Sequence, residues 1–493
     1  MVLIISGHKF HYEMENLCRV FFPNENIIIN YNNTVDNNEK IVVITSLSQI
    51  DDTHVKISAE IKFDDIFESC ECISMNEGSV DFELKMAVLL FDILTKVTQY
   101  RPKWGILTGV RPSKLLSKLI ADMGEEKAKD YFEKSLLVIP QKTNLAMNIA
   151  KKEQEIIEKS KPNSFSLYVS IPFCPTRCSY CSFVSHSITS ESAKKLLPEY
   201  LNLLCEELKE TAKIAKDIGL KLETVYVGGG TPSILDSQQT QRLLKEICND
   251  FDVSDIKEFT FEAGRPDTID TSKLKAISEF PVSRISINPQ SFSDIVLNEI
   301  GRKHTAQQTI DAFKLARDIG FNDINMDIIA GLPKDDIESF KNTLNTLLEL
   351  SPSSITVHTL ALKRSANMTD DTTISKQGEL TCEMVDLAEK MLSNNGYIPY
   401  YMYRQSKSVG NLENVGWCKK GFEGYYNVYM MEECHTVLAV GAGAVTKLKA
   451  PFGDYIERIF NFKYPYEYNN RFETILERKN KVYNFYEYHK LGG

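Results

Sequence analysis

The sequence lacks an uninterrupted apolar segment that is long enough to cross a bilayer. Its most apolar helix candidate, MAVLLFDILTKV, carries Asp92 and Lys96, whereas a membrane-spanning helix needs about 20 predominantly apolar residues. The beginning of the sequence also lacks the charged segment, apolar run and cleavage site of a secretory signal. We therefore expect a cytoplasmic protein with no stable membrane insertion.

An excess of positive charge is also missing. The chain has 57 basic and 67 acidic residues, so its net charge is −10. A nucleic-acid-binding protein usually carries a basic surface, and we expect no nucleic-acid partner. The hydrophobic content of 43% and the charged content of 25% are those of an ordinary globular protein.

Regularly spaced cysteines are absent as well. The chain has 11 cysteines, an odd number, without the even spacing of a disulfide framework. Cys70 and Cys72 form a CxC pair with no third ligand nearby, so a metal site there is disfavoured. Four other cysteines fall in apolar helical patterns and are interpreted as small core residues: Cys18, Cys205, Cys248 and Cys382.

The length of 493 residues suffices for two or three domains, and we find no internal repeat. Residues 1–160 combine short β-rich runs with a stretch of helical patterns, and they predict an N-terminal α/β and helical domain. We expect residues 159–165 to form a polar linker. A second domain is expected over 166–400, and a C-terminal cap of helices and short strands over 401–493.

From residue 166 onward, short β-branched runs alternate with amphipathic helical segments. The strand candidates are 166–171, 224–228, 258–263, 284–288, 323–330 and 354–360. Six strand–helix units in succession predict a parallel sheet with right-handed crossovers. On pattern alone, a partial barrel and an open doubly wound sheet fit equally well.

Unusual residues follow the strand candidates at the end where such folds bind ligands. They are Cys174, the segment 228–231, Glu262, Gln290 and Asp327. His358, at the end of the sixth strand, faces the same end, as a substrate contact or as a structural residue. Together these residues predict a site.

Cys174, Cys178 and Cys181 have the spacing C-x3-C-x2-C. A structural zinc site would need a fourth ligand, for which His186 is conceivable. Three thiolates alone suit an iron–sulfur cluster in which one iron has no protein ligand. That iron would remain open to a second molecule.

The C-x3-C-x2-C loop after the first strand resembles the radical S-adenosylmethionine enzymes. The resemblance implies a partial (β/α)6 barrel, a [4Fe–4S] cluster held by Cys174, Cys178 and Cys181, and S-adenosylmethionine bound to the open iron. One electron from the cluster then cleaves the sulfonium to give a 5′-deoxyadenosyl radical.

The flanking motifs resemble the oxygen-independent coproporphyrinogen III oxidase family over about residues 166–450. They are LYVSIPFC, VYVGGGTPS, RISINPQSF, GRKH and NMDIIAGLP. Further segments, among them WGILTGVRPSKL and GAGAVTKL, are similar to the HemZ-type branch of this family and extend the resemblance to nearly the full chain.

The family pattern also implies roles for individual residues. The positions that match cofactor contacts are Tyr168, Tyr180, Gly229, Gly230, Thr231, Glu262, Gln290, Arg302 and Asp327. Glu262 could instead pair with Arg265, Arg302 could be an exposed charge, and the two tyrosines could be barrel packing. Tyr400, Tyr401, Tyr403 and Arg404 could hold a tetrapyrrole propionate or form a core stripe.

The resemblance implies oxidative decarboxylation of coproporphyrinogen III in porphyrin and heme biosynthesis, with a flavodoxin or ferredoxin as electron donor. Two positions depart from the pattern. Ser170 stands where the well-characterised oxidases have histidine, and Phe183 where they have a fourth cysteine. A heme-binding chaperone and a heme-directed radical methyltransferase therefore stay open as alternatives.

Overall fold

The computed structural model describes residues 1–31, 39–77, 81–181, 183, 185–361, 374–405 and 407–490. The chain divides into two compact units. Among the described residues, the first unit comprises 1–150, 374–382 and Tyr403–Glu413, and the second comprises the remainder. The domain boundaries expected from the sequence, at residues 160, 166 and 400, remain predictions.

The first unit contains a five-stranded sheet in the order β2-β1-β3-β4-β5. Its strands are β1 (Val2–Ser6), β2 (Ile28–Asn30), β3 (Ile41–Gln49), β4 (His54–Phe63) and β5 (Ile66–Met75). β1 is parallel to both of its neighbours, and β3, β4 and β5 form an antiparallel meander. β5 was not among the strand candidates.

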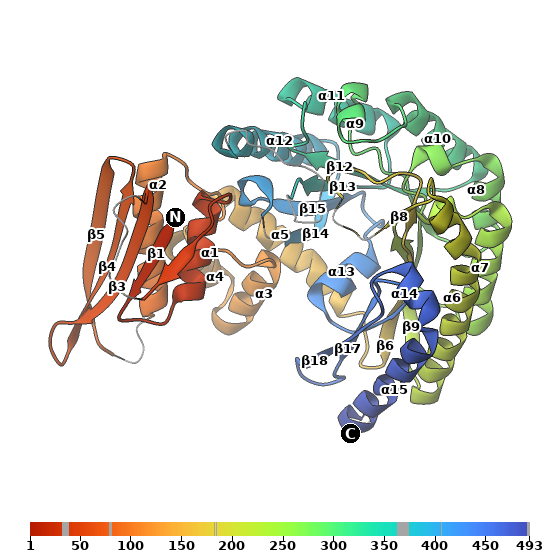
Figure 1. The fold of residues 1–493 in the computed structure, drawn as a ribbon, viewed down its shortest axis with the longest axis horizontal. Helices are drawn as coiled ribbons and strands as arrows, with labels where there is room; N and C mark the ends of the chain where they lie inside the picture. Colours follow the sequence, from red (N-terminus) through yellow and green to blue (C-terminus); the bar gives the residue numbers. More distant parts are fainter. Residues whose placement is uncertain are drawn as a thin grey trace. The chain divides into compact units, whose positions relative to one another are not determined.

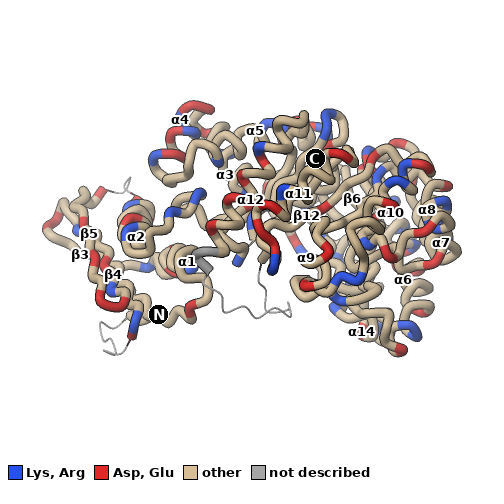
Figure 2. The backbone as a smooth tube through the Cα atoms, turned by 90° about the horizontal axis from the view of Figure 1, so that it is seen from above, with Lys and Arg blue, Asp and Glu red and all other residues tan. Residues whose placement is uncertain are grey.

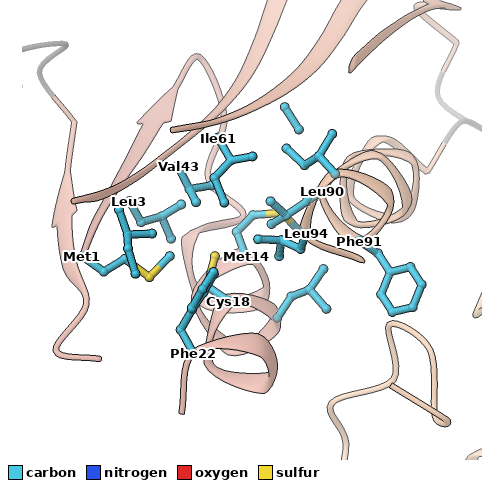
Figure 3. Packing of buried hydrophobic residues seen from close by; sticks show 14 of the residues in the cluster. Met1, Leu3, Met14, Cys18, Phe22, Val43, Ile61, Leu90, Phe91 and Leu94 are labelled. Atoms are coloured by element: carbon cyan, nitrogen blue, oxygen red, sulfur yellow. The ribbon is translucent and has the colours of Figure 1, made fainter. Parts of the chain in front are cut away.

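Two helices, α1 (His11–Phe21) and α2 (Phe82–Thr98), pack against this sheet and complete a hydrophobic core with it. Figure 3 shows Leu3, Met14, Val43 and Leu90 directed toward one another from strands and helices. Cys70 and Cys72 lie on β5 and pack against this core, and the Cys70 thiol donates to the Leu89 carbonyl at 3.3 Å. The CxC pair is therefore part of the packing between β5 and α2.

The rest of the first unit is helical as far as residue 150. It consists of α3 (Pro112–Met123), α4 (Glu125–Asp130), the π-helical turn η1 (Tyr131–Ser135) and the first part of α5 (Pro140–Ile157). Lys142 is fully buried and pairs with Glu413 at 2.6 Å. Trp104 donates its indole N–H to the same carboxylate at 2.7 Å.

The second unit contains a sheet of 11 strands in the order β14-β15-β13-β12-β11-β10-β9-β6-β16-β17-β18. The six predicted strands are β6 (Ser164–Ile171), β9 (Lys221–Gly229), β10 (Glu258–Glu262), β11 (Arg284–Ser286), β12 (Asp323–Ala330) and β13 (Ser354–Thr359). They are all parallel and follow one another in chain order. The predicted partial barrel fold is confirmed.

C-terminal strands extend this sheet on both sides. They are β14 (Ile398–Arg404), β15 (Glu413–Cys418), β16 (Thr436–Val440), β17 (Val445–Lys449) and β18 (Ile456–Phe460). β16 pairs with β6 in parallel, so the parallel part has a seventh strand that the pattern of strand–helix units did not predict. Tyr400, Tyr401 and Arg404 of β14 are buried, which favours the core interpretation of that cluster.

Helices cover the outside of the strands (Figure 1). They include α6 (Glu191–Ile218), α7 (Ser237–Asp250), α8 (Thr271–Ser278), α10 (Ala306–Ile319) and α11 (Ile337–Leu350). Asp236 and Thr305 form capping boxes that start α7 and α10. Among the described residues, no helix combines the length and apolar character that a bilayer crossing requires.

The two faces of the parallel strands differ in chemistry. One face is apolar and buried against the helices, with Leu167, Val225, Phe261, Ile285, Met326 and Val357. The register places polar side chains on the other face: Tyr168, Tyr226, Glu262, Ser286, Asn325, Asp327, Thr356 and His358. Period-two alternation therefore turns a row of polar groups toward the inside of the barrel.

Candidate active site

The three cysteines lie on a loop that is closed at its base. β6 leads into β7 (Phe173–Cys174), which pairs with β8 (His186–Ser187). The Ile188 N–H donates to the Cys174 carbonyl at 3.0 Å, and the Ser179 N–H donates to the Ile300 carbonyl at 3.1 Å. The loop is thus fastened both to itself and to the segment that contains Arg302.

The glycine segment at the end of β9 supports the first cysteine. The Gly230 N–H donates to the Ile171 carbonyl at 2.8 Å, and the Thr231 N–H donates to the Phe173 carbonyl at 2.7 Å. A Cβ atom on Gly230 would lie 2.5 Å from the Phe173 carbonyl oxygen, and Gly229 has a φ of +106°. These glycines permit close backbone approach, and the N–H groups of Gly230 and Thr231 are used within the chain.

Polar groups surround the thiols. The Thr231 hydroxyl donates to Cys174 Sγ at 3.5 Å, and Arg265 Nη1 donates to Cys178 Sγ at 3.8 Å. Burial raises the pKa of the Cys174 thiol, and it raises that of Cys181 to about 11. Because the ligand form of cysteine is the thiolate, the nearby cations and hydrogen-bond donors favour the charged form that burial opposes.

Arg302 connects the cysteine loop to the end of β11. Its Nη2 donates to the Tyr180 hydroxyl at 3.1 Å, and its Nη1 donates to the Asn288 carbonyl at 2.6 Å. Arg302 is buried, and its Nε has no hydrogen-bond partner in the described part of the chain. The alternative of an exposed helix charge is wrong.

Gln290 is held in an unusual backbone conformation. Its φ is +66°, in a region that residues other than glycine adopt seldom. The Gln290 N–H donates to the Asp327 carbonyl at 2.9 Å, and the Ile329 N–H donates to the Gln290 carbonyl at 3.0 Å. Its side-chain Oε1 is buried and has no partner among the described residues, so it is available to a ligand.

Glu262 and Asp327 have opposite pKa shifts. Burial raises the pKa of Glu262 to about 7, and the charge of Asp327 contributes to the rise. Burial also disfavours ionised Asp327, but interactions with His358, Asn325 and other donors outweigh it and lower the Asp327 pKa. Two neighbouring carboxyls thus have different protonation preferences near neutral pH.

Three tyrosines stack beside these carboxyls. Tyr226 and Tyr426 have ring centroids 4.5 Å apart, and Tyr168 lies 6.3 Å from each of them. The Tyr226 hydroxyl donates to Glu262. Tyr426 comes from α13 (Tyr425–Glu432), so an element from the C-terminal region reaches the polar face. Sequence reasoning missed Tyr226 and Tyr426; the inward position of Tyr226 on β9 was the available signal.

The structure places the three cysteines and the predicted cofactor contacts in the second unit, whereas Tyr403 and Arg404 of the aromatic cluster belong to the first. Most of the cofactor contacts lie at the carboxyl ends of the parallel strands or in the loops that follow them. Tyr168 and Asp327 lie within β6 and β12, and Arg302 follows the helix α9 (Asp294–Glu299).

Arg265 does not pair with Glu262 as the alternative interpretation expected; it pairs with Asp267 at 2.9 Å. Within the described residues, no three His, Cys, Asp or Glu side chains converge on a single ion position.

The profile of the radical SAM superfamily matches residues 168–347, which include the cysteine loop and the strands of the site. Proteins of this superfamily use a [4Fe–4S] cluster and S-adenosylmethionine.

The residues present fit both groups. Three cysteines on one loop, with a hydroxyl donor at Cys174 Sγ and a guanidinium donor at Cys178 Sγ, suit a four-iron cluster of which three irons would each be bound by one thiolate and the fourth would have no protein ligand. The unpaired Gln290 Oε1 and Arg302 Nε are buried polar atoms, and such atoms normally have a partner. A polar cofactor next to the loop would supply it.

Known proteins resemble the chain over most of its length. The oxygen-independent coproporphyrinogen-III oxidase-like protein HemZ of Bacillus subtilis is 35% identical, over 97% of this chain and 96% of the relative. The heme chaperone HemW of Haemophilus influenzae is 31% identical, over 64% of this chain and 78% of the relative. The solved coproporphyrinogen III oxidase HemN of Escherichia coli has a TM-score of 0.49 at 22% identity, over 66% of this chain and 73% of that one. The cysteine loop, the parallel strands and the full-length similarity together establish that the chain belongs to the radical SAM superfamily and, within it, to the family of oxygen-independent coproporphyrinogen-III oxidase-like proteins.

Proposed function

We propose that the chain catalyses the oxidative decarboxylation of coproporphyrinogen III to protoporphyrinogen IX in the cytoplasm. The observation that carries this proposal is the meeting of the three-cysteine loop with the polar inner face of the barrel. A relative named for coproporphyrinogen oxidase-like character, which matches 97% of this chain, supports the choice of substrate.

The cysteine thiolates 174, 178 and 181 would hold the cluster. When bound, the cluster and S-adenosylmethionine supply one-electron cleavage chemistry that removes a hydrogen atom from the substrate. Each of two propionates, once it has lost the hydrogen atom, would lose CO2 and one electron, which passes to an external acceptor, and become a vinyl group. The other two propionates of the substrate would remain.

The other site residues would bind and orient S-adenosylmethionine. We assign the ribose hydroxyls to ionised Asp327, which only accepts hydrogen bonds, and the methionyl carboxylate to Arg302, whose planar fork suits carboxylates. Gln290 would use its unpaired Oε1. The remaining contacts are assigned to Tyr168, Tyr180, Gly229, Gly230, Thr231 and Glu262, with the N–H groups of Gly230 and Thr231 excluded because the chain uses them itself.

An external one-electron donor is required, and a flavodoxin or ferredoxin has the right chemistry. Such carriers are acidic, whereas basic and acidic residues are both distributed over the helices of this chain (Figure 2). Arg177 on the cysteine loop and Lys303 beside Arg302 are both exposed. They would supply local positive charge for docking.

A heme-binding chaperone is the second candidate, and two residues favour it. Ser170 replaces the family histidine, is buried, and donates to the Ala442 carbonyl at 2.8 Å, so it serves packing between β6 and the turn after β16. Phe183 replaces the fourth cysteine, and its side chain is 67% exposed. A relative at 31% identity is named a heme chaperone.

Anaerobic turnover distinguishes these functions. The cluster-loaded chain is incubated with coproporphyrinogen III, S-adenosylmethionine and a chemical reductant, and the products are analysed by porphyrin fluorescence and mass spectrometry. Loss of one CO2 and two hydrogens per vinyl group supports the oxidase. Tight heme binding without product supports the chaperone, and S-adenosylhomocysteine with a methylated product would indicate a methyltransferase.

A further inference from the structure

A buried ion pair stands next to the second cysteine of the loop. Arg265 is 3% exposed, and its Nε and Nη2 donate to the two carboxylate oxygens of Asp267, each at 2.9 Å. The third nitrogen, Nη1, donates to the Thr176 hydroxyl at 3.2 Å and to Cys178 Sγ at 3.8 Å. One guanidinium therefore joins an acidic residue to the cysteine loop.

The turn that contains Arg265 and Asp267 is held in place by hydrogen bonds of Thr268. Arg265 precedes the 3-10 turn η3 (Pro266–Thr268), and the Thr268 hydroxyl donates to the Arg265 carbonyl at 2.7 Å. Thr268 also shares a hydrogen bond of 2.5 Å with Ser233, from the turn after β9. The position of the guanidinium is consequently set by the fold rather than by a flexible surface loop.

A third residue borders the pair and lacks partners. His304 Nδ1 lies 3.9 Å from Asp267 Oδ1, too far for a hydrogen bond. The His304 side chain is fully buried, and neither ring nitrogen has a hydrogen-bond partner among the described residues. An unpaired buried imidazole is costly, so His304 has hydrogen-bonding capacity that its described neighbours leave unused.

We propose that Arg265 and Asp267 set the reduction potential of the cluster, as positioning residues with opposite electrostatic effects. Adding an electron makes an iron–sulfur cluster more negative, and its potential depends on nearby charge and on hydrogen bonds to sulfur. Arg265 stabilises the reduced form, because its charge is buried and directed at Cys178. Asp267 counteracts part of this charge and holds the guanidinium fork.

This proposal rests on the cluster assignment and not on the identity of the substrate. A purely structural brace would make the same contacts, but it would not give potential shifts of opposite sign. Coulomb attraction weakens with distance and with exposure to water. Arg265 touches the loop and is 3% exposed, whereas the Asp267 side chain is 23% exposed. The arginine effect should therefore be the larger.

The test is an anaerobic redox titration of the cluster-loaded chain, without S-adenosylmethionine or substrate, followed by electron paramagnetic resonance. Arg265→Gln should shift the midpoint potential to a more negative value, and Asp267→Asn should shift it by a smaller amount to a more positive value. Arg265→Lys, which keeps the charge, should lie near the parent chain. Arg242→Gln, on the exposed side of α7, should leave the potential unchanged.

Shifts of equal sign in Arg265→Gln and Asp267→Asn, or unchanged potentials with full iron content, would overturn the proposal. If Arg265→Gln fails to retain iron, Asp267→Asn decides: a positive shift supports the proposal, and no shift contradicts it. Because the titration contains no tetrapyrrole, its result is independent of whether the chain acts as an oxidase or as a chaperone.

Discussion

At the scale of single residues, the inner face of the barrel combines groups whose protonation is linked. Glu262 accepts a hydrogen bond from the Tyr226 hydroxyl and is repelled, when ionised, by the charge of Asp327. Because the pKa of Glu262 is raised from 4.5 to about 7, the folded chain keeps this proton at pH values between the two, where the unfolded chain has already released it. The ionised form of this carboxyl is therefore a cost to the fold unless a ligand compensates it.

This cost predicts a pH-dependent effect of Glu262→Gln on stability. The folded pKa of about 7 exceeds the ordinary value of 4.5, so the parent chain loses stability as the pH rises between these values. The full penalty above pH 7 is on the order of 3 kcal/mol. Glutamine cannot ionise, so the thermal midpoint of the variant relative to the parent should be higher at pH 8 than at pH 5.

The comparison uses the cluster-loaded chain without S-adenosylmethionine, followed by calorimetry. Glu349→Gln, at an exposed position on α11, serves as the control and should give the same difference at both pH values. A Glu262→Gln difference that does not change with pH would show that the carboxyl is ionised in the folded chain throughout.

The cysteine loop gives a second prediction at this scale. Alanine at any one of Cys174, Cys178 or Cys181 should abolish retention of the cluster, because only three thiolates are provided. Iron and sulfide analysis after anaerobic purification measures the loss, and cleavage of S-adenosylmethionine should disappear with it. Cys248→Ala, on α7 outside the loop, should retain full iron content; a loaded cluster in Cys178→Ala would refute the ligand assignment.

The sequence indicated the cysteines of the proposed cluster site more directly than their surroundings. A short motif such as C-x3-C-x2-C carries its own spacing, so candidate metal-binding residues can be identified locally. The partners of Arg265 and His304 depend on how turns after different strands meet, and no local pattern contains that information. Tyr426 reaches the site from α13. This helix comes after β13, the last predicted strand, with further helices and strands between them in the sequence.

At the scale of elements, a single buried carboxylate joins the C-terminal elements to the barrel. Glu207 of α6 accepts hydrogen bonds from the Tyr468 hydroxyl at 2.7 Å, the Gly441 N–H at 2.7 Å and the Asn461 amide at 2.8 Å. Lys479 pairs with it at 2.9 Å, and both charges are buried. α14 (Pro465–Asn470), α15 (Phe472–His489) and the turn after β16 thus share one anchor.

Removing this charge should destabilise the second unit strongly. Glu207→Gln would leave Lys479 as a buried cation without its counter-ion, at a cost of about 3–5 kcal/mol. The midpoint of urea unfolding should fall accordingly. The double variant Glu207→Gln with Lys479→Met removes both charges and should be less destabilised than Glu207→Gln alone; a double variant that is worse than the single one would contradict this account of the anchor.

The strands of the barrel could be predicted because each is a compact apolar run with β-branched residues. The strand β5 and the pairing of β16 with β6 were missed for different reasons. β5 is an edge strand with polar and apolar residues mixed along it, and most of its residues are exposed. It therefore lacks a continuous apolar signal. β16 is apolar, but its pairing with β6 joins distant parts of the sequence.

At the scale of the whole molecule, the first unit is not contiguous in sequence. The segment Tyr403–Glu413 belongs to it although the barrel lies in between. Lys142 and Trp104 both depend on Glu413, whereas the β-sheet and the helices α1 and α2 form their own core within the first 98 residues. The two halves of this unit therefore have different requirements for folding.

Fragments can test this difference. A fragment of residues 1–98 should show protected amides in β1, β3 and β4, measured by hydrogen exchange. In a fragment of residues 1–150, the helices after residue 100 should remain unprotected, because burying Lys142 without a counter-ion costs about 3–5 kcal/mol. Adding Lys142→Met to the longer fragment should restore part of the protection. Full protection of these helices in the unmodified 1–150 fragment would refute the dependence on Glu413.

The pairing of Trp104 with Glu413 also imposes an order on how the protein is made. The two residues are 309 positions apart, and a ribosome adds about 5–20 residues per second. The nascent helices near the amino terminus must wait roughly 15–60 seconds for this partner at that rate, while the barrel emerges. During this delay the indole N–H of Trp104 lacks the carboxylate that accepts its hydrogen bond in the folded chain.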